Sequence, residues 1–293
     1  MKKMLFIINP VSGKRVLEDC LMDIVSTFCA ADYDVNVYVT KSEQDMMDTA
    51  GKRADEFDII VCCGGDGTLN IVAGAVYHSG SSTIIGYIPG GTTNDFANSH
   101  RINTVASAAA KQIASGTVRQ IDLGLLCSSP FIYVAAFGVF SAVSYETSRE
   151  LKQNLGHAAY VIEGIKSLAK AKSYRVKVRY NGNELEEDLI YGMVSNSKRV
   201  GGFEMPIMQN VLYDDGKMEV MLIRQPKNPV ETTKLLNCLV TQVADDDMIR
   251  MFRTSRLEYE CDEEIPWTID GEFGGSYGSG VVDVCEGALK MLY

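Results

Sequence analysis

The sequence predicts two domains: an α/β domain with a doubly wound parallel sheet at residues 1–122, and an antiparallel β-sandwich at residues 123–293. Two observations lead to this fold class. In the first part, short runs that are apolar throughout alternate with apolar residues at helical spacing, which is typical of a parallel sheet covered by helices on both faces. In the second part, polar and apolar residues alternate and turn residues are frequent, which indicates antiparallel strands.

The spacing of apolar residues predicts four strands and three helices in the first domain. The strands are expected at residues 4–9, 35–39, 58–63 and 83–88, and the helices at 16–28, 69–77 and 104–115. Ligands of such sheets bind in the loops that follow the carboxyl ends of the strands. We therefore expect a binding site in the loops after these four strands.

In the second domain, charged and apolar side chains alternate strictly at residues 174–180, and Asn181-Gly182 follows as a hairpin turn. The return strand is expected at 185–195, further strands at 218–223, 256–260, 267–269 and 281–285, and helices near 158–169 and 230–239. A last strand near 289–293 is a candidate to return to the first domain. The uncharged stretch 123–145 is broken by a Ser-Ser-Pro turn, so we expect two buried strands rather than a membrane span.

Composition and charge narrow the function classes. The chain has 293 residues, of which 46% are hydrophobic and 23% charged, as in ordinary globular proteins. Its net charge of -10 argues against a nucleic-acid partner, because phosphates require a cationic surface. The eight cysteines include no C-x-x-C pair, which argues against structural zinc and fits a reducing compartment. We expect a cytoplasmic protein whose membrane contact, if any, is peripheral.

A glycine-rich sequence, Gly-Gly-Asp-Gly-Thr at residues 64–68, separates a predicted strand from a predicted helix and is called the first glycine loop. Glycines bring backbone N–H groups close to a ligand, and the N-terminus of the following helix attracts anions. A plain helix cap requires only one polar residue, so three glycines around one aspartate favour a phosphate site. The spacing does not fit a dinucleotide fingerprint, because Asn70 stands where a third glycine is needed.

Other loops add to this site. Residues 89–96, the second glycine loop, follow the fourth strand, and residues 9–14 follow the first. By itself, the second glycine loop could be a turn with a helix cap, but loops after neighbouring strands face the same crevice. Two acidic turns, at residues 214–216 and 270–272, fit solvated hairpin turns, and the first of them also fits a site for a hard cation.

Taken together, these segments resemble the bacterial diacylglycerol kinase family, which is related to sphingosine kinases and, more remotely, to NAD kinases. The matching segments are residues 9–14, 64–70, 89–96, 201–202 with Pro206, 214–216 and 270–272. They occur in this order through the whole chain. The coincidence of all six is highly specific, whereas Gly-Gly-Asp-Gly-Thr alone would also suit an NAD kinase.

The resemblance implies an ATP- and Mg²⁺-dependent lipid kinase with its active site in the cleft between the two domains. It assigns ATP contacts to Asn9, Pro10, Val11, Ser12, Gly13, Thr40, Gly65, Asp66, Gly67, Thr68, Leu69, Asn70 and Thr92. It implies that Asp66 and Asp95 organise the catalytic Mg²⁺ through water, and that Glu272 accepts the proton of the lipid hydroxyl. A structural Mg²⁺ would be held by the Asp215 carboxylate and the main-chain carbonyls of Leu212 and Lys217.

The acceptor implied by the resemblance is diacylglycerol or a related membrane lipid. One departure is Ile71, which stands where the family usually has glutamate. Because of this departure, a non-catalytic regulator that binds a nucleotide or a lipid remains an alternative. An NAD kinase is a second alternative, because the first glycine loop would suit one, but residues 9–14 and 89–96 argue against it.

The sequence does not determine the oligomeric state, and a homodimer is one of the states left open. A separate feature of the sequence is a run of cationic residues. Six cations without an intervening acid fit either a solvated surface or a contact with an anionic membrane surface. They are Lys166, Lys170, Lys172, Arg175, Lys177 and Arg179.

Overall fold

The computed structural model describes residues 1–12, 17, 19–139, 171–200, 203–204, 211–241, 243, 245 and 247–293. The chain forms two compact units. Unit 1 comprises Met1–Leu123, Tyr213–Asp215 and Cys285–Tyr293, and unit 2 comprises Gly124–Leu212 and Gly216–Val284. Strands β5 (Val118–Leu126) and β15 (Glu272–Leu292) each contribute residues to both units. The helix predicted near 158–169 lies outside the described residues.

Unit 1 contains a parallel sheet in the order β2-β1-β3-β4-β15. Its first four strands are β1 (Lys2–Ile8), β2 (Tyr33–Val39), β3 (Ile59–Gly64) and β4 (Ile84–Pro89). The end of β15 joins this sheet through Met291 and Leu292, which pair with β4. Strand β3 is buried along its whole length because it lies between β1 and β4 with helices on both faces, which explains its uninterrupted apolar sequence.

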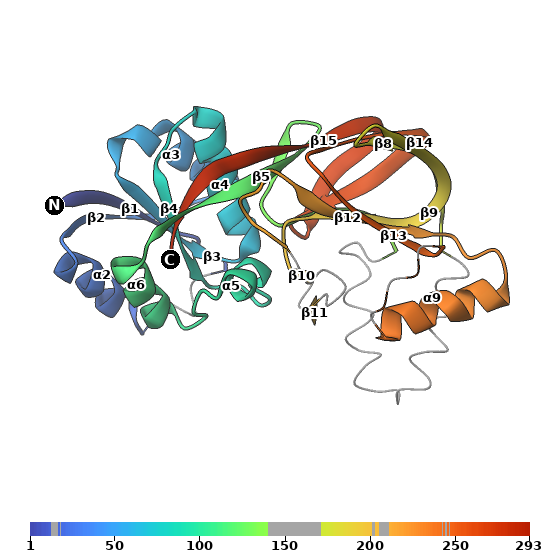
Figure 1. Cartoon of the computed structure of the whole chain (residues 1–293). Coiled ribbons are helices and arrows are strands. Elements are labelled where there is room, and N and C mark those ends of the chain that lie inside the picture. Colours follow the sequence, from blue (N-terminus) through green and yellow to red (C-terminus); the bar gives the residue numbers. More distant parts are fainter. Residues whose placement is uncertain are drawn as a thin grey trace. The chain divides into compact units, whose positions relative to one another are not determined.

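Helices cover both faces of this sheet (Figure 1). Helices α2 (Leu21–Ala30) and α6 (Ala106–Ser115) pack together on one face, and α3 (Glu43–Lys52) and α4 (Asp66–Ser79) on the other. The helix predicted at 16–28 is found as α2, although Val16 and Glu18 lie outside the described residues.

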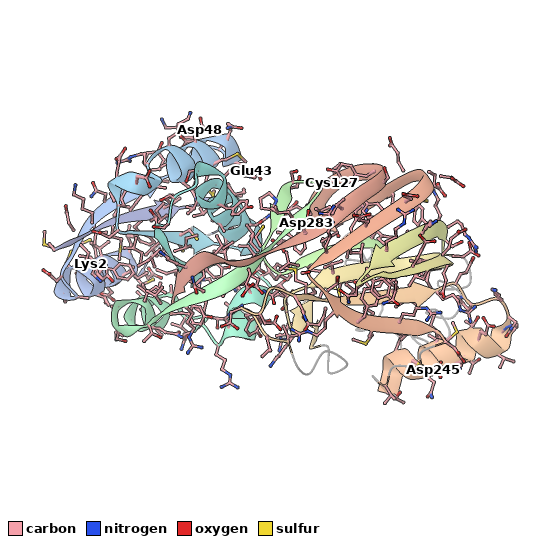
Figure 2. All side chains as sticks on the ribbon, turned by 45° about the horizontal axis from the view of Figure 1, so that its top comes forward. Lys2, Glu43, Asp48, Cys127, Asp245 and Asp283 are labelled. Atoms are coloured by element: carbon pink, nitrogen blue, oxygen red, sulfur yellow. The ribbon has the colours of Figure 1, made fainter. Side chains whose placement is uncertain are left out.

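The sequence did not predict α3 or the short α5 (Asp95–His100). Helix α3 buries only Met46, Thr49 and Ala50, whereas its Glu43 and Asp48 lie on the outward side (Figure 2). The segment contains few apolar residues, so its sequence does not resemble that of a helix that covers a sheet. The helix begins at a Ser42 cap, whose hydroxyl accepts the Asp45 N–H at 3.1 Å.

Unit 2 is built on antiparallel strands. Two long strands, β9 (Asn183–Ser195) and β14 (Arg256–Ile269), both pair with β8 (Tyr174–Tyr180) and with β7 (Val134–Gly138). These four strands therefore close on themselves around a core that includes Phe137 and Trp267. Strands β12 (Met218–Arg224) and β13 (Ile249–Thr254) continue the sheet from β9. Small elements complete the unit: β6 (Ser129–Phe131), β10 (Arg199–Val200), β11 (Phe203–Glu204) and α9 (Pro229–Thr241).

Several predicted strands are longer than expected. The strands predicted at 256–260 and 267–269 form the single strand β14, because its pairing with β15 shifts register between Glu260 and Ile265 without ending the strand. Likewise, the strands predicted at 281–285 and 289–293 both fall on β15, which ends at Leu292. The structure describes the uncharged stretch 123–145 as far as residue 139. This part contains the end of β5 and the whole of β6 and β7. Among the described residues, no helix has the length and apolar character needed to cross a membrane.

Candidate functional site

Two loops of unit 1 meet at Thr68, in the first turn of α4. The Thr68 hydroxyl oxygen accepts a hydrogen bond from Asn9 Nδ2 at 2.9 Å and lies 3.4 Å from Ser12 Oγ, so it ties the loop after β1 to the first glycine loop. Gly64 has no room for a side chain, because an added Cβ would lie 2.3 Å from Thr68 Oγ1. The helix N-cap is Gly65, which has no side chain to cap the helix. The N–H groups at the start of α4 are thus arranged as in anion sites.

The second glycine loop packs directly on the first. Gly90 N donates to the Gly64 carbonyl at 2.6 Å. Asn94, in the left-handed region with a φ of 51°, accepts the Gly91 N–H at its Oδ1 and donates from Nδ2 to the Gly91 carbonyl, both at 3.0 Å. Asparagine tolerates this backbone conformation better than most residues. The two glycine loops are therefore joined into one surface, called the ledge, at the carboxyl ends of β3 and β4.

Asp66 connects the same two loops through its carboxylate. Its Oδ2 accepts the Asp95 N–H at 3.0 Å and its Oδ1 accepts the Phe96 N–H at 3.2 Å, so Asp66 caps α5 rather than its own helix. Burial raises the pKa of Asp66 to about 6, and the Asp95 carboxylate raises it as well, whereas the N–H donors lower it. The two carboxylates repel each other, so a cation bound between them would be stabilised.

The donor set of Asp66 and Asp95 fits Mg²⁺. The described part of the chain has no cluster of three or more acidic, histidine or cysteine side chains that could hold a metal alone. Mg²⁺ is usually held by one or two carboxylates together with substrate phosphates and water. Two carboxylates beside the ledge, which is the candidate phosphate site, match this arrangement.

The remaining predicted ATP contacts lie in the loops after β1, β2 and β4 and on α4. The Thr40 hydroxyl, after β2, donates to the Ile8 carbonyl at 3.2 Å and is buried. The Leu69 side chain is fully buried in the core, so only its backbone could meet a ligand. The other contacts are less enclosed, and Gly13 lies outside the described residues. The contacts that are exposed or half-buried are Asn9, Pro10, Val11, Ser12, Gly65, Gly67, Asn70 and Thr92.

In unit 2, the turn between β14 and β15 is held by Asp270. Its buried carboxylate accepts three backbone N–H bonds, from Ile132 at 2.7 Å, Tyr133 at 3.0 Å and Val134 at 2.9 Å. Asp270 and Gly271 both have positive φ values, 49° and 90°. This turn fixes the start of β15, where Glu272 is exposed. The sequence indicated the turn but not this clamp, because the three donors lie more than 130 residues away.

Comparison with known proteins identifies the family. Residues 3–126 match the diacylglycerol kinase catalytic domain, and residues 134–293 match the YegS C-terminal NAD kinase beta sandwich-like domain. The chain is 30% identical over 278 residues to the diacylglycerol kinase of Bacillus subtilis (strain 168), covering 94% of this chain and 91% of that protein. The chain belongs to the bacterial diacylglycerol kinase family.

Two further members of the diacylglycerol kinase family are similar to this chain over nearly its whole length. The diacylglycerol kinase of Staphylococcus carnosus (strain TM300) is 28% identical over 281 residues, covering 94% of this chain and 90% of the relative. A crystal structure of an assigned diacylglycerol kinase from Bacillus anthracis str. Sterne is 26% identical, covers 100% of this chain and 95% of its own, and superposes with a TM-score of 0.82. The likeness therefore extends over both units.

The diacylglycerol kinase resemblance also predicted a structural Mg²⁺ and a motif at Gly201, Gly202 and Pro206. These three motif residues lie outside the described residues. Of the predicted Mg²⁺ ligands, Asp215 belongs to unit 1, and Leu212 and Lys217 belong to unit 2. This cation site stays a prediction.

The predicted cationic patch on β8 is electrically balanced in the described residues. Each of its four described cations forms an ion pair with a carboxylate, whereas Lys166 and Lys170 lie outside the described residues. The pairs are Lys172–Glu263, Arg175–Glu186, Lys177–Glu184 and Arg179–Glu260. Cross-strand pairs of this kind form a charge ladder. Contact of this patch with an anionic membrane surface stays a prediction.

Proposed function

We propose that this chain is an ATP-dependent lipid kinase that transfers the γ-phosphate of ATP to a hydroxyl of diacylglycerol or a related membrane lipid. The observation that carries the proposal is the ledge made by the two glycine loops, with the N-terminus of α4 and the Asp66 carboxylate beside it. Membership of the diacylglycerol kinase family supports the same reaction class.

Unit 1 would bind the nucleotide. Phosphoryl transfer requires mainly positioning and neutralisation of charge. The backbone N–H groups at residues 65–68 would hold phosphate oxygens, and Asp66 and Asp95 would hold the Mg²⁺ that accompanies ATP. When bound, this Mg²⁺ supplies positive charge to the phosphates. The raised pKa of Asp66 fits this role, because a bound cation would stabilise its ionised form.

Unit 2 would supply the general base. We assign this role to Glu272, whose side chain is exposed and whose turn is fixed by Asp270. A placed base typically contributes about 10²–10⁴-fold to the rate. The proton of the lipid hydroxyl would pass to a Glu272 carboxylate oxygen as the hydroxyl oxygen attacks the γ-phosphorus. The bond between the γ-phosphorus and the β–γ bridging oxygen would break, and ADP would leave with its electron pair.

The lipid must come from a membrane, so we propose a peripheral contact with an anionic membrane surface. Because Lys172, Arg175 and Arg179 each pair with a carboxylate, the β8 face gives this contact little support. Salt dependence of vesicle binding would report its electrostatic part, because charges on the surface are screened within a Debye length.

A phosphorylation screen tests the proposal. Purified protein, Mg²⁺ and γ-labelled ATP would be incubated with vesicles that carry diacylglycerol, a sphingoid base, ceramide or a polyprenol, and separately with NAD. We expect label in a lipid product and a requirement for Mg²⁺. Label in NAD alone would make the chain an NAD kinase. ATP binding without transfer to any acceptor would instead support a regulator, for which Ile71 in α4 is the motivating departure.

A further inference from the structure

We propose that Tyr87 is a positioning residue for ATP: its buried hydroxyl holds the Gly64 carbonyl inward and thereby turns the Gly65 N–H toward the phosphates. The inference rests on the proposed function, because it concerns the same nucleotide site. It adds a residue of β4 that lies outside both glycine-loop sequences and that the sequence motifs do not indicate.

The Tyr87 hydroxyl contacts both glycine loops at once. It donates to the Gly64 carbonyl at 3.1 Å and lies 3.4 Å from Asn94 Oδ1. The side chain is fully buried, and its ring packs edge-on against Phe96 at 6.1 Å between centroids. Burial raises the pKa of Tyr87 well above its ordinary value, so the hydroxyl keeps the proton that it donates.

The orientation of one peptide group follows from this contact. In a trans peptide the C=O and the N–H point in opposite directions. Two donors hold the Gly64 carbonyl toward β4, namely Tyr87 Oη and Gly90 N. The Gly65 N–H must therefore point to the opposite side, where its acceptor is Ser12 Oγ at 3.4 Å. A hydrogen bond of this length is weak, so a phosphate oxygen could replace the serine hydroxyl.

The hydroxyl can be removed without leaving an unpaired acceptor. In Tyr87→Phe, the Gly64 carbonyl would still accept from Gly90 N, and Asn94 Oδ1 would still accept from Gly91 N. The cost of an orphaned buried group is thereby avoided. The variant should fold normally while the 64–65 peptide becomes less firmly oriented, which separates an effect on binding from an effect on folding.

The test compares Tyr87→Phe with Tyr77→Phe. Tyr77 is the matched control, because it lies in the last turns of α4, at the end remote from the glycine loops. Its hydroxyl lies 3.2 Å from Sγ of Cys285, which belongs to β15. Calorimetric titration with Mg·ATP and with AMP would be run on both variants and the wild type. For Tyr87→Phe we expect the Kd and KM for ATP to rise about 3- to 10-fold, the effect of one ordinary hydrogen bond. AMP binding and the KM for the lipid should not change.

The outcomes are distinguishable. If the wild type does not bind Mg·ATP, the proposed nucleotide site fails and the role of Tyr87 fails with it. If the wild type binds and Tyr87→Phe binds equally tightly, only the role of Tyr87 is overturned. Should Tyr87→Phe melt at a lower temperature than Tyr77→Phe, hydrogen exchange of the Gly65 amide well below Tm gives a second measurement. Exchange at the wild-type rate would overturn the inference.

Discussion

Gly91 lies so close to Gly65 that a Cβ added at Gly91 would be 2.7 Å from the Gly65 Cα. Gly91→Ala must therefore separate the two glycine loops. We expect a loss of about 1–3 kcal/mol in the free energy of unfolding, as for other overpacked sites. A strain of the same size at the nucleotide site weakens ATP binding by about 5- to 150-fold, since 1.4 kcal/mol is a tenfold change.

Gly65→Ala is the matched control for this steric argument. A Cβ at Gly65 would lie 3.5 Å from the Gly91 Cα, an ordinary contact, and the backbone at Gly65 is extended. Its unfolding free energy in urea should stay within about 1 kcal/mol of the wild type. Equal destabilisation of the two variants would contradict the contact between the loops.

Asp66→Asn should lose Mg²⁺-dependent activity, because the substitution removes the charge that orders the metal and leaves one amide group facing a backbone N–H donor. Activity would be titrated against Mg²⁺ concentration. A variant with full activity and the wild-type Mg²⁺ dependence would show that Asp66 serves only to cap α5.

Glu272→Gln should abolish turnover and leave ATP binding near normal, because an amide keeps the size of the side chain but cannot accept the proton. Since Glu272 is exposed, its replacement should not change the melting temperature. The readouts are single-turnover lipid phosphorylation and calorimetric ATP titration. Activity within a few-fold of the wild type would exclude Glu272 as the base.

Asp270→Ala should destabilise unit 2 by about 3–5 kcal/mol, because it leaves three buried N–H groups without their shared acceptor. The matched control is Asp283→Ala on β15, whose carboxylate is about 42% exposed and pairs with Arg256. Such an exposed pair contributes about 1 kcal/mol or less. Chemical denaturation followed by Trp267 fluorescence would compare them, and similar losses would refute the clamp.

Acid should destabilise unit 1 through His100. Burial, with a smaller effect of Arg119, lowers the pKa of His100 from 6.5 to about 3 in the folded protein. The unfolded chain takes up a proton below pH 6.5 but the folded chain does not, so stability is complete above pH 6.5 and falls as the pH drops toward 3.

At pH 5 the loss from His100 should be about 2 kcal/mol, since each pH unit contributes about 1.36 kcal/mol. His100→Phe keeps a ring beside Phe96, with which His100 stacks at 4.2 Å. Between pH 7 and pH 5, the wild type should therefore lose about 2 kcal/mol of unfolding free energy in urea relative to this variant, in which the other groups, Asp66 included, still titrate. An unchanged dependence would mean that His100 titrates normally in the folded state.

The sequence predicted the elements whose signal is local. Strand β3 could be predicted because it is buried on both faces and its sequence is therefore apolar throughout. The phosphate site was predicted from the residues of the first glycine loop alone. Helix α5 could not be predicted in this way, because its cap comes from Asp66, 29 residues before Asp95. The contact of Tyr87 with Gly64 depends on the register between β3 and β4, and no local pattern encodes that register.

The pairing of β15 with β4 has a consequence for biosynthesis. Unit 1 includes Cys285–Tyr293, and Met291 pairs with Ile85 in its sheet. On the ribosome, about two hundred residues that follow β4 must be translated before this partner strand emerges, at about 5–20 residues per second. For that time the nascent chain presents an unpaired strand edge, which is a template for aggregation. A molecular chaperone that binds extended apolar segments would have its natural target at β4.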